Sequence, residues 1–355
     1  DERFGKSACE VFAFDREEKL RGDRAPFLVD LPVSVRIWTR PDFQKEQFEV
    51  LRQARPSVLF LVSDGGRNDE ERRLIGLSRQ LFEGIDWDCE VHKLYWEENL
   101  GMYKSGILAT QHVWKCVDRC VWLEDDIVPS ISAFRFWAEM LDLYENDTRI
   151  LGVCAMNHEE VSEEVSSDYF FSREASIWGM ATWRRSGDGR GDVDWGSDQY
   201  LMKRMIDNAG INPDFVRRLK GYVRNPHYEG HVPSSEFWFA FSTLLTNQVY
   251  VVPKRNMICN RGCRADSAHA DDKRLLPKGV QRVFDMKTYE LDFPLKHLRW
   301  VVPDIRYQKA VYRIMGVGHP LVSLHRRLSR VVRILVFSGP SALRRKFAGR
   351  KRVED

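Results

Sequence analysis

The sequence lacks the phosphate-binding loops that mark two large classes of nucleotide-binding protein. No Gly-x-Gly-x-x-Gly follows the first predicted strand, and no Gly-x-x-x-x-Gly-Lys-Ser/Thr occurs anywhere in the 355 residues. The first motif holds the pyrophosphate of a dinucleotide, and the second holds the phosphates of a nucleoside triphosphate. These absences argue against a dinucleotide-dependent dehydrogenase and against a P-loop nucleotidase.

Long apolar runs and metal-binding cysteine pairs are also missing. No uninterrupted apolar stretch reaches the length of a membrane span, and 43% apolar with 30% charged residues is typical of a globular protein. None of the seven cysteines forms a Cys-x-x-Cys pair, and most of them are expected in the core. A disulfide between Cys116 and Cys120 or between Cys259 and Cys263 is an alternative that the sequence does not decide. Internal repeats and low-complexity linkers are absent, which favours one catalytic domain with extensions.

Positive charge is concentrated near the C-terminus. Residues 321–355 contain ten Arg or Lys against two acids, a net charge of +8; since the whole chain carries +3, the remainder carries −5. Leucines and valines alternate with these charges. The segment is expected either to bind an anionic membrane surface or to pack an apolar helix stripe on the protein, whereas nucleic acid is not expected as a partner.

Short apolar strands alternate with helices in the first 155 residues, which predicts an α/β fold. Such alternation is typical of a mainly parallel, Rossmann-like central sheet with helices on both faces. Strands are predicted at residues 33–38, 57–63, 89–95, 120–124 and 150–155, and helices at about 41–54, 68–84, 103–116 and 133–144. Helices at 198–209 and 234–246 and a strand at 248–252 follow. The expected organisation is an N-terminal extension (1–30), a catalytic domain (31–300) and a basic helical C-terminal extension (301–355).

An acidic triplet, Glu124-Asp125-Asp126, follows the apolar strand that starts at Cys120, and Pro129 stops the continuation of that strand. Three carboxylates this close repel each other unless a positive charge neutralises them, and a hard divalent cation with oxygen ligands does so well. The alternative is a solvated acidic turn or a helix N-terminus capped by Asp. The buried strand before the triplet favours a metal site.

Other polar residues follow the neighbouring predicted strands. Thr39 and Arg40 follow the first strand, Asp64 the second, and Lys104 lies after the third. Ligands of open α/β sheets bind beyond the carboxyl ends of the strands. A carboxylate that can accept from a nucleobase, cations that can bind phosphate and a metal site together suit a nucleoside diphosphate.

Together these motifs resemble those of a known family. The sequence resembles, over residues 33–269, the bacterial nucleotide-diphospho-sugar transferases of the GT-A fold, and its Glu-Asp-Asp form of the DXD motif is similar to that of N-acetylglucosaminyltransferase I. The residues that carry the resemblance are Asn99-Leu100-Gly101 with Lys104, Trp122 to Pro129, Ser176 to Arg185, Val251 to Lys254, Asn260-Arg261-Gly262 and Asp266 to His269.

The resemblance implies a role for each matched residue. Asp126 would bind Mn²⁺ or Mg²⁺ directly, and His269, next to Asp266, would be a late metal ligand; an ordinary loop histidine is the alternative for His269. Glu124 and Asp125 would contact the ribose or reach the metal through water. Donor contacts are also implied for Thr39, Arg40, Asp64 (to the uracil edge), Lys104 (to the nucleotide or phosphate), Trp178 and Gly179.

A general base is the remaining requirement of sugar transfer. Relatives of the resembled family carry a Trp-Asp pair where this chain has Ser234-Ser235-Glu236-Phe237-Trp238, so Glu236 is the expected base. Its alternative is an acid in the first turn of a capped helix. Asp192, Asp194 and Asp198 are reserve candidates. Trp178 and Trp183 are expected either to form a stacking wall for the sugar or to lie in the core.

The expected function is a metal-dependent, inverting glycosyltransferase that moves a sugar from a UDP-sugar to a hydroxyl of a glycan, a lipid-linked or another acceptor. A nucleotidyltransferase or phosphohydrolase that uses the same carboxylates is the first rival, and a non-catalytic carbohydrate-binding protein is the second. The chain begins with Asp, which suggests a trimmed segment. Its expected place is the cytoplasmic face of a membrane as a peripheral protein, with the Golgi or another secretory lumen as the alternative.

Overall fold

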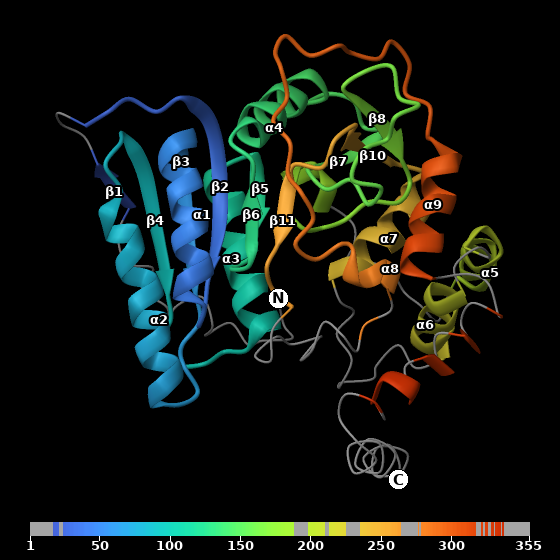
Figure 1. Ribbon diagram of the computed structural model, residues 1–355, viewed down its shortest axis with the longest axis horizontal. Helices are drawn as coiled ribbons and strands as arrows, with labels where there is room; N and C mark the ends of the chain where they lie inside the picture. The colour runs from blue at the N-terminus through green and yellow to red at the C-terminus, as the bar shows by residue number, and fades with distance from the viewer. Residues whose placement is uncertain are drawn as a thin grey trace.

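The computed structural model describes residues 17–20, 24–187, 198–209, 213–224, 235–263, 276, 278–316, 321, 324–325, 328–329, 331–334 and 336. The predicted α/β fold is confirmed: a nine-stranded central sheet runs through the protein, with helices around it (Figure 1). A second sheet of two strands, β6 (Ile127–Pro129) and β11 (Ile258–Asn260), lies beside it. The small sheet joins segments 130 residues apart in the sequence.

The central sheet is mainly parallel. Its order is β1-β4-β3-β2-β5-β9-β7-β10-β8. Because β4, β3, β2 and β5 pair in parallel, and β7 and β10 do so too, six of the nine strands run in one direction; β1, β9 and β8 run in the other. The bounds are β1 Glu17–Leu20, β2 Val29–Ile37, β3 Pro56–Ser63, β4 Cys89–Tyr95, β5 Arg119–Leu123, β7 Ile150–Cys154, β8 Tyr169–Ser172, β9 Met180–Trp183 and β10 Val249–Pro253.

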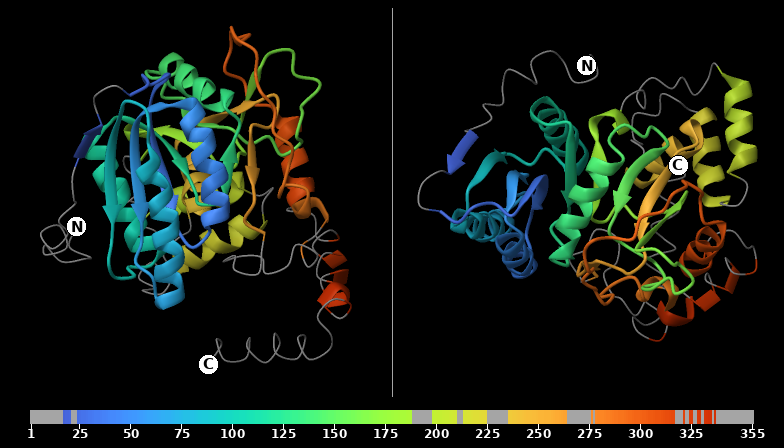
Figure 2. Two further views of the ribbon diagram at one scale, coloured as in Figure 1. Left: turned by 60° about the vertical axis from the view of Figure 1, so that its left-hand side comes forward. Right: turned by 90° about the horizontal axis from the view of Figure 1, so that it is seen from above.

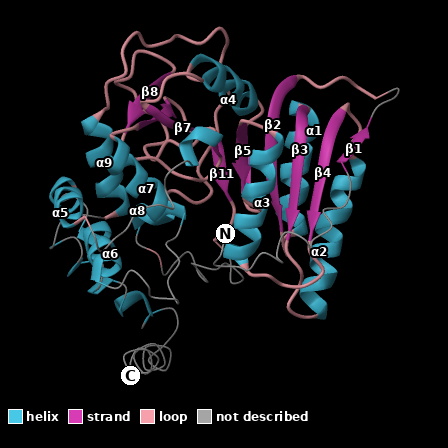
Figure 3. Cartoon of the chain, turned by 180° about the vertical axis from the view of Figure 1, so that it is seen from behind, coloured by secondary structure: helices cyan, strands magenta, loops and turns pink. Residues whose placement is uncertain are grey.

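Helices cover both faces of the parallel half of the sheet. Helices α1 (Pro41–Ala54) and α2 (Asp69–Leu81) lie in front of β2, β3 and β4 in Figure 1, and α3 (Met102–Cys116) lies in front of the sheet when it is seen from behind (Figure 3). The alternation of side chains along the strands produces these two layers. Leu59 and Leu61 of β3 belong to the core under α1, whereas Phe60 and Val62 face α3.

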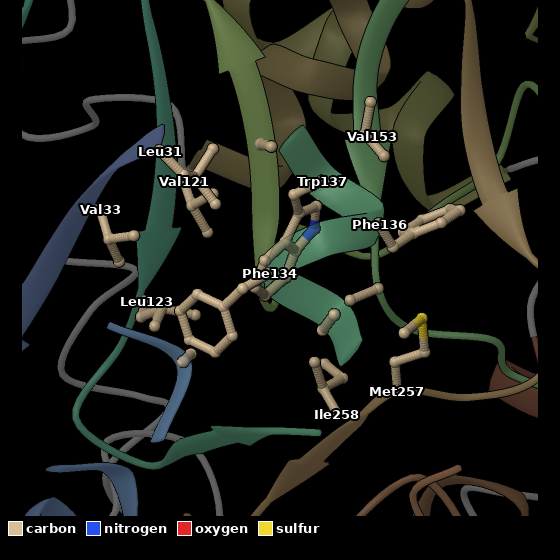
Figure 4. Close-up of a cluster of buried hydrophobic side chains, with 14 of the residues drawn as sticks. Leu31, Val33, Val121, Leu123, Phe134, Phe136, Trp137, Val153, Met257 and Ile258 are labelled. Carbon is tan, nitrogen blue, oxygen red and sulfur yellow. The ribbon is translucent and has the colours of Figure 1, made fainter. Parts of the chain in front are cut away.

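Helix α4 (Ser132–Leu143) closes the core next to the acidic triplet. Phe134 and Trp137 of this helix are at most 1% exposed. Figure 4 shows Phe134 beside Leu123, the last residue of β5, and Ile258 of β11 in the same cluster. The strand that leads into the acidic triplet is therefore held by close-packed apolar side chains, which makes its position rigid.

The C-terminal half completes the sheet and adds a second group of helices. Helix α9 packs against the sheet through Tyr307 and Val311, which are at most 4% exposed. The views in Figure 2 place the C-terminal half alongside the N-terminal half, with α5 and α6 at the outer side. The remaining bounds are η3 Phe82–Gly84, η4 Arg184–Gly187, α5 Gln199–Asn208, α6 Pro213–Arg224, α7 Ser235–Thr246, α8 Lys278–Gln281 and α9 Ile305–Met315.

Neither of the two disulfides considered from the sequence is present in the described part of the chain. Their cysteines, Cys116, Cys120, Cys259 and Cys263, are thiols there. In the same part of the chain, no helix has the length and hydropathy needed to cross a bilayer. The proposed domain limits at residues 30 and 300 stay predictions.

Candidate functional site

The carboxyl ends of β4, β3, β2 and β5 meet at one edge of the sheet because these four strands are parallel neighbours. Arg40 follows β2, Asp64 follows β3 and Glu124 follows β5, so the side chains predicted to bind a ligand are brought to this edge. In the sequence these three residues are 24 to 84 positions apart. Parallel register makes them neighbours.

The acidic triplet is paired with a cation from the end of β2. Nη1 of Arg40 donates to Oδ2 of Asp126 at 2.7 Å and lies 3.6 Å from Oδ1 of Asp125. Arg40 is only 8% exposed, and the side chains of Asp125 and Asp126 are 15% and 13% exposed. This arrangement differs from a solvated acidic turn, because charges so poorly hydrated need compensation from nearby groups.

The surroundings of Glu124 disfavour its ionised form. Its side chain is reached by water but is surrounded by protein atoms, and this desolvation, together with the charges of Asp126, Asp125 and Glu236, raises its pKa to about 8. The guanidinium of Arg36 opposes the shift.

Glu236 is brought to the acidic triplet from the other half of the chain. It lies in the first turn of α7, it is exposed, and its charge is one of those that raise the pKa of Glu124. The two carboxylates are 112 residues apart in the sequence. Their interaction indicates that the predicted base lies near the predicted metal ligands.

Arg36 is a site residue that the sequence reasoning missed. It lies on β2 beneath the triplet, where burial lowers its pKa while the charges of Glu124, Asp64 and Asp125 raise it. Nη1 of Arg36 donates to Oγ of Ser105 on α3 at 3.2 Å. The only signal in the sequence was an arginine near the end of a predicted strand.

Two glutamines of α1, also missed, fix the backbone of the acidic turn. Nε2 of Gln47 donates to the carbonyl oxygens of Glu124 at 2.8 Å and Ile127 at 2.7 Å. Nε2 of Gln44 donates to Oε1 of Gln47 at 2.9 Å, and both glutamines are fully buried. Because buried carbonyls need a donor, these contacts hold the turn in one conformation.

Asp64 is used in part to shape the loop after β4. Its Oδ1 accepts from the backbone N–H of Gly65 at 2.9 Å and of Leu100 at 2.8 Å. Gly65 is required here, because a Cβ would lie 2.4 Å from the carbonyl carbon of Glu98. The carboxylate thus joins the ends of β3 and β4. Its predicted contact with uracil stays a prediction.

Lys104 and Thr39 lie at the same edge. Lys104 is in the first turn of α3, which begins after Gly101 at φ 81°, and both Lys104 and Thr39 are half-buried. Unpaired N–H groups and the helix dipole make such an N-terminus favourable for anions. Their predicted roles toward the donor are consistent with this position and are not tested by it.

The late Asn260-Arg261-Gly262 motif packs directly under the acidic triplet. Strand β11 pairs with β6, so that Asn260 lies opposite Ile127, and the N–H of Arg261 donates to the carbonyl oxygen of Asp126 at 2.9 Å. A Cβ at Gly262 would lie 1.9 Å from Oδ2 of Asp126. Gly262 is therefore needed to leave room for that carboxylate.

We expect Gly262→Ala to displace the carboxylate of Asp126 and to weaken Mn²⁺ binding by about tenfold or more, as is typical when the support of a metal ligand is changed. Isothermal titration with Mn²⁺ measures this. The matched control is Gly76→Ala on α2, where a Cβ meets nothing within 4 Å. An unchanged Mn²⁺ affinity in Gly262→Ala would show that Asp126 does not hold the ion.

The Trp178–Trp183 segment divides between two environments. Trp183 is 3% exposed and donates from Nε1 to the carbonyl oxygen of Leu141 at 3.2 Å, so it lies in the core. Trp178 is partly buried against Phe284, at 5.4 Å between ring centroids. A Cβ at Gly179 would lie 3.0 Å from Ile258 and its φ is 59°, which gives this glycine a packing role independent of any ligand.

Of the reserve candidates for the base, the structure describes only Asp198. Asp198 caps α5, because its Oδ1 accepts from the N–H of Leu201 at 2.8 Å. The predicted positions Asp192, Asp194, Asp266 and His269 lie outside the described residues.

The donor set fits a hard divalent cation. Among the described residues, Glu124, Asp125, Asp126 and Glu236 supply four carboxylates, and Arg36 and Arg40 supply two cations. Burial, and then the neighbouring carboxylates, disfavour the ionised form of Glu124 and raise its pKa, which a bound cation would oppose. Carboxylate oxygens are the ligands that Mn²⁺ and Mg²⁺ prefer.

Comparisons with known proteins give no family. No family model matches the chain, and no curated protein does. Among solved structures, a UDP-glucose pyrophosphorylase complexed with UDP-glucose aligns over 65% of this chain and 92% of its own, with 10% identity and a TM-score of 0.31. An apo UDP-glucose pyrophosphorylase aligns over 65% of this chain and 93% of its own, with 11% identity and a TM-score of 0.30. TarS 1–349 from S. aureus aligns over 87% of this chain and 72% of its own, with 10% identity and a TM-score of 0.36. Likeness at this level assigns no reaction.

Proposed function

We propose that this protein is a metal-dependent glycosyltransferase that moves a sugar from a nucleotide-sugar, a UDP-sugar, to a hydroxyl of an acceptor. The observation that carries the proposal is the placement of Glu236 within electrostatic reach of Glu124, at the edge where Asp125, Asp126 and Arg40 meet. A metal site alone would suit many enzymes. A further carboxylate near the metal site adds what an acceptor hydroxyl requires.

Donor binding is assigned to the sheet edge. Asp126 would hold Mn²⁺ or Mg²⁺, with Glu124 and Asp125 near the ribose, and His269 as a further ligand. A bound cation there would neutralise negative charge on the departing diphosphate. Asp64 would accept from the base; Thr39, Arg40 and Lys104 would bind the phosphates, and Trp178 and Gly179 the sugar.

Glu236 is assigned the proton transfer. Its carboxylate accepts the proton of the acceptor hydroxyl while that oxygen bonds to the anomeric carbon and the bond from this carbon to the diphosphate breaks. Attack from the side opposite the leaving group inverts the anomeric configuration. Exposure of Glu236 at the start of α7 leaves room for an acceptor such as a glycan or a lipid-linked hydroxyl.

The test is a product analysis with a panel of UDP-sugars, Mn²⁺ and hydroxyl acceptors. Release of UDP together with a glycosylated acceptor of inverted configuration supports the proposal. Release of UMP or of a sugar phosphate would identify a nucleotidyltransferase or phosphohydrolase instead. Metal and nucleotide binding without any turnover, across the panel, would identify a carbohydrate-binding protein of this fold.

We also propose that the C-terminal segment binds an anionic membrane surface, as expected of a peripheral protein on the cytoplasmic face. The support is a stripe of apolar side chains, all at least 52% exposed, at helical spacing within the basic segment: Leu321, Leu324, Leu328, Val332 and Val336. Apolar side chains on a basic helix suit the interface of an anionic bilayer.

Co-sedimentation with vesicles tests the membrane proposal. The protein is expected to bind vesicles that contain phosphatidylserine and to lose this binding when Leu324→Asp and Leu328→Asp are combined, since both the apolar area and the charge balance change. Leu77→Asp, at a position 41% exposed on α2, is the matched control. If the double variant bound the vesicles as well as the wild type, Leu324 and Leu328 would not contact the membrane, and the proposal for this segment would be contradicted.

A further inference from the structure

A cluster of metal-ligating side chains lies apart from the carboxylate edge, between β4 and α3. It consists of His92 on the strand and of His112 and Cys116 on the helix, and one ligand atom from each lies within 4.8 Å of the other two. Nδ1 of His92 is 3.4 Å from Nε2 of His112, which is 3.7 Å from Sγ of Cys116. Nothing in the proposed reaction uses these groups.

The fold brings the three side chains together for a simple reason. His112 and Cys116 are four residues apart on a helix and therefore share one face. Helix α3 covers the face of the sheet on which His92 lies, next to Phe60, whose ring stacks on that of His92 at 4.5 Å between centroids. Packing thus fixes the orientation of the buried imidazole before any ligand binds.

The distances match the edges of a tetrahedral zinc site. Zinc binds imidazole nitrogen at about 2.0–2.1 Å and thiolate sulfur at about 2.3 Å, so a tetrahedral centre separates two nitrogens by about 3.3 Å and a nitrogen from a sulfur by about 3.6 Å. The two observed separations are 3.4 and 3.7 Å. The third separation, between His92 and Cys116, is at most 4.8 Å, so an ion that binds all three atoms needs these two to approach by no more than about 1.2 Å.

A carboxylate supports the cluster from behind. Nε2 of His92, the nitrogen on the other side of the ring, lies 2.9 Å from Oε1 of Glu90. Metal-binding histidines commonly donate their second nitrogen to a carboxylate, which fixes the tautomer and strengthens the metal bond. With Nε2 as the donor, Nδ1 of His92 carries the lone pair that faces His112 and Cys116.

We propose that His92, His112 and Cys116 form a binding site for Zn²⁺ or a similar borderline divalent cation. Two imidazoles and a thiolate are softer ligands than the carboxylates at the sheet edge, so the two sites differ in the metal they select. Cys116 is exposed and is the last residue of α3, whereas Lys104 lies in the first turn. The ion would tie the C-terminal end of α3 to β4, away from the nucleotide edge, and the proposal does not depend on the proposed function.

Titration of the full-length protein with Co²⁺ tests this site, because Co²⁺ replaces Zn²⁺ and is visible by absorption. The thiol proton of Cys116 is released to solvent when sulfur bonds to the ion. We expect one equivalent of Co²⁺ to give the visible bands of a tetrahedral centre and a sulfur-to-cobalt charge-transfer band, and Zn²⁺ to bleach both. No charge-transfer band in the wild type would overturn the proposal.

Variants identify the ligands. Cys116→Ser should lose the charge-transfer band, and its exposed position protects the fold, which circular dichroism checks. Glu90→Gln should weaken Co²⁺ binding by about 10- to 100-fold, the usual cost of losing such a supporting carboxylate. His325→Gln, at an exposed position elsewhere, is the control. A charge-transfer band that persists in Cys116→Ser would assign the thiolate to another cysteine and contradict the site.

Discussion

Asp126→Asn is expected to abolish Mn²⁺-dependent binding of UDP while leaving the fold intact. Asparagine has nearly the same shape and can still accept from Nη1 of Arg40, which Asp126 contacts at 2.7 Å. It removes the charge that a hard cation requires. Loss of a group that supports a metal ligand costs about 10- to 100-fold in metal affinity, so loss of the ligand itself should cost at least about 100-fold. Because UDP binds through the ion, its affinity in Mn²⁺ should fall by the same factor.

Two comparisons make this result specific. Binding of UDP is measured by titration with Mn²⁺ and with excess chelator, and only the first value should change. Asp118→Asn is the matched control: Asp118 lies at the opposite end of β5, exposed and paired with Arg184 at 2.5 Å. If Asp126→Asn retained the UDP affinity of the wild type in Mn²⁺, the ion would not be held by the acidic triplet.

Glu236→Gln is expected to lower kcat by at least about 100-fold with little change in donor affinity. Glutamine keeps the size of the side chain but cannot accept the acceptor proton, and general-base catalysis contributes about 10²- to 10⁴-fold. Because the charge of Glu236 raises the pKa of Glu124, the substitution also lowers that pKa, so Glu124 stays available as a carboxylate. A fall in kcat without a loss of UDP affinity separates the role of a base from that of a metal ligand.

The control for this variant is Glu145→Gln, an exposed glutamate after α4. Steady-state rates of acceptor glycosylation are measured at several pH values, because removal of a base also removes the acidic limb of the rate profile. Wild-type rates in Glu236→Gln would contradict the assignment and would require another acid as the base. Asp198 is the described alternative, although its side chain already caps α5.

Much of the fold could be predicted because the local signals and the tertiary environment agree. The helix predicted at 41–54 and the strand predicted at 89–95 have these bounds in the structure, as α1 and β4. Proline at the start of the helix and alternation along the strand are strong local signals. The short strands β6 and β11 were missed, because their pairing joins Ile127 to Asn260 and carries no local pattern.

The strand pattern alone predicted only the part of the candidate site that follows strand ends, and Glu236 was predicted from the family resemblance. Arg40, Asp64 and the acidic triplet were found because parallel strands bring their carboxyl ends together. Gln47 was missed, since its two acceptors lie 77 and 80 residues away, and Arg36 was missed for the same reason. The cluster of His92, His112 and Cys116 between β4 and α3 was not predicted, because only His112 and Cys116 share a helix and His92 comes from another element.

The most direct test is a crystal soaked with Mn²⁺ and UDP. The account predicts an anomalous manganese peak in contact with Asp126 and the diphosphate of UDP, with Glu236 facing the space beyond the phosphates. It would be contradicted by nucleotide bound away from the carboxyl ends of β2, β3 and β5, or by manganese with no oxygen ligand from the triplet.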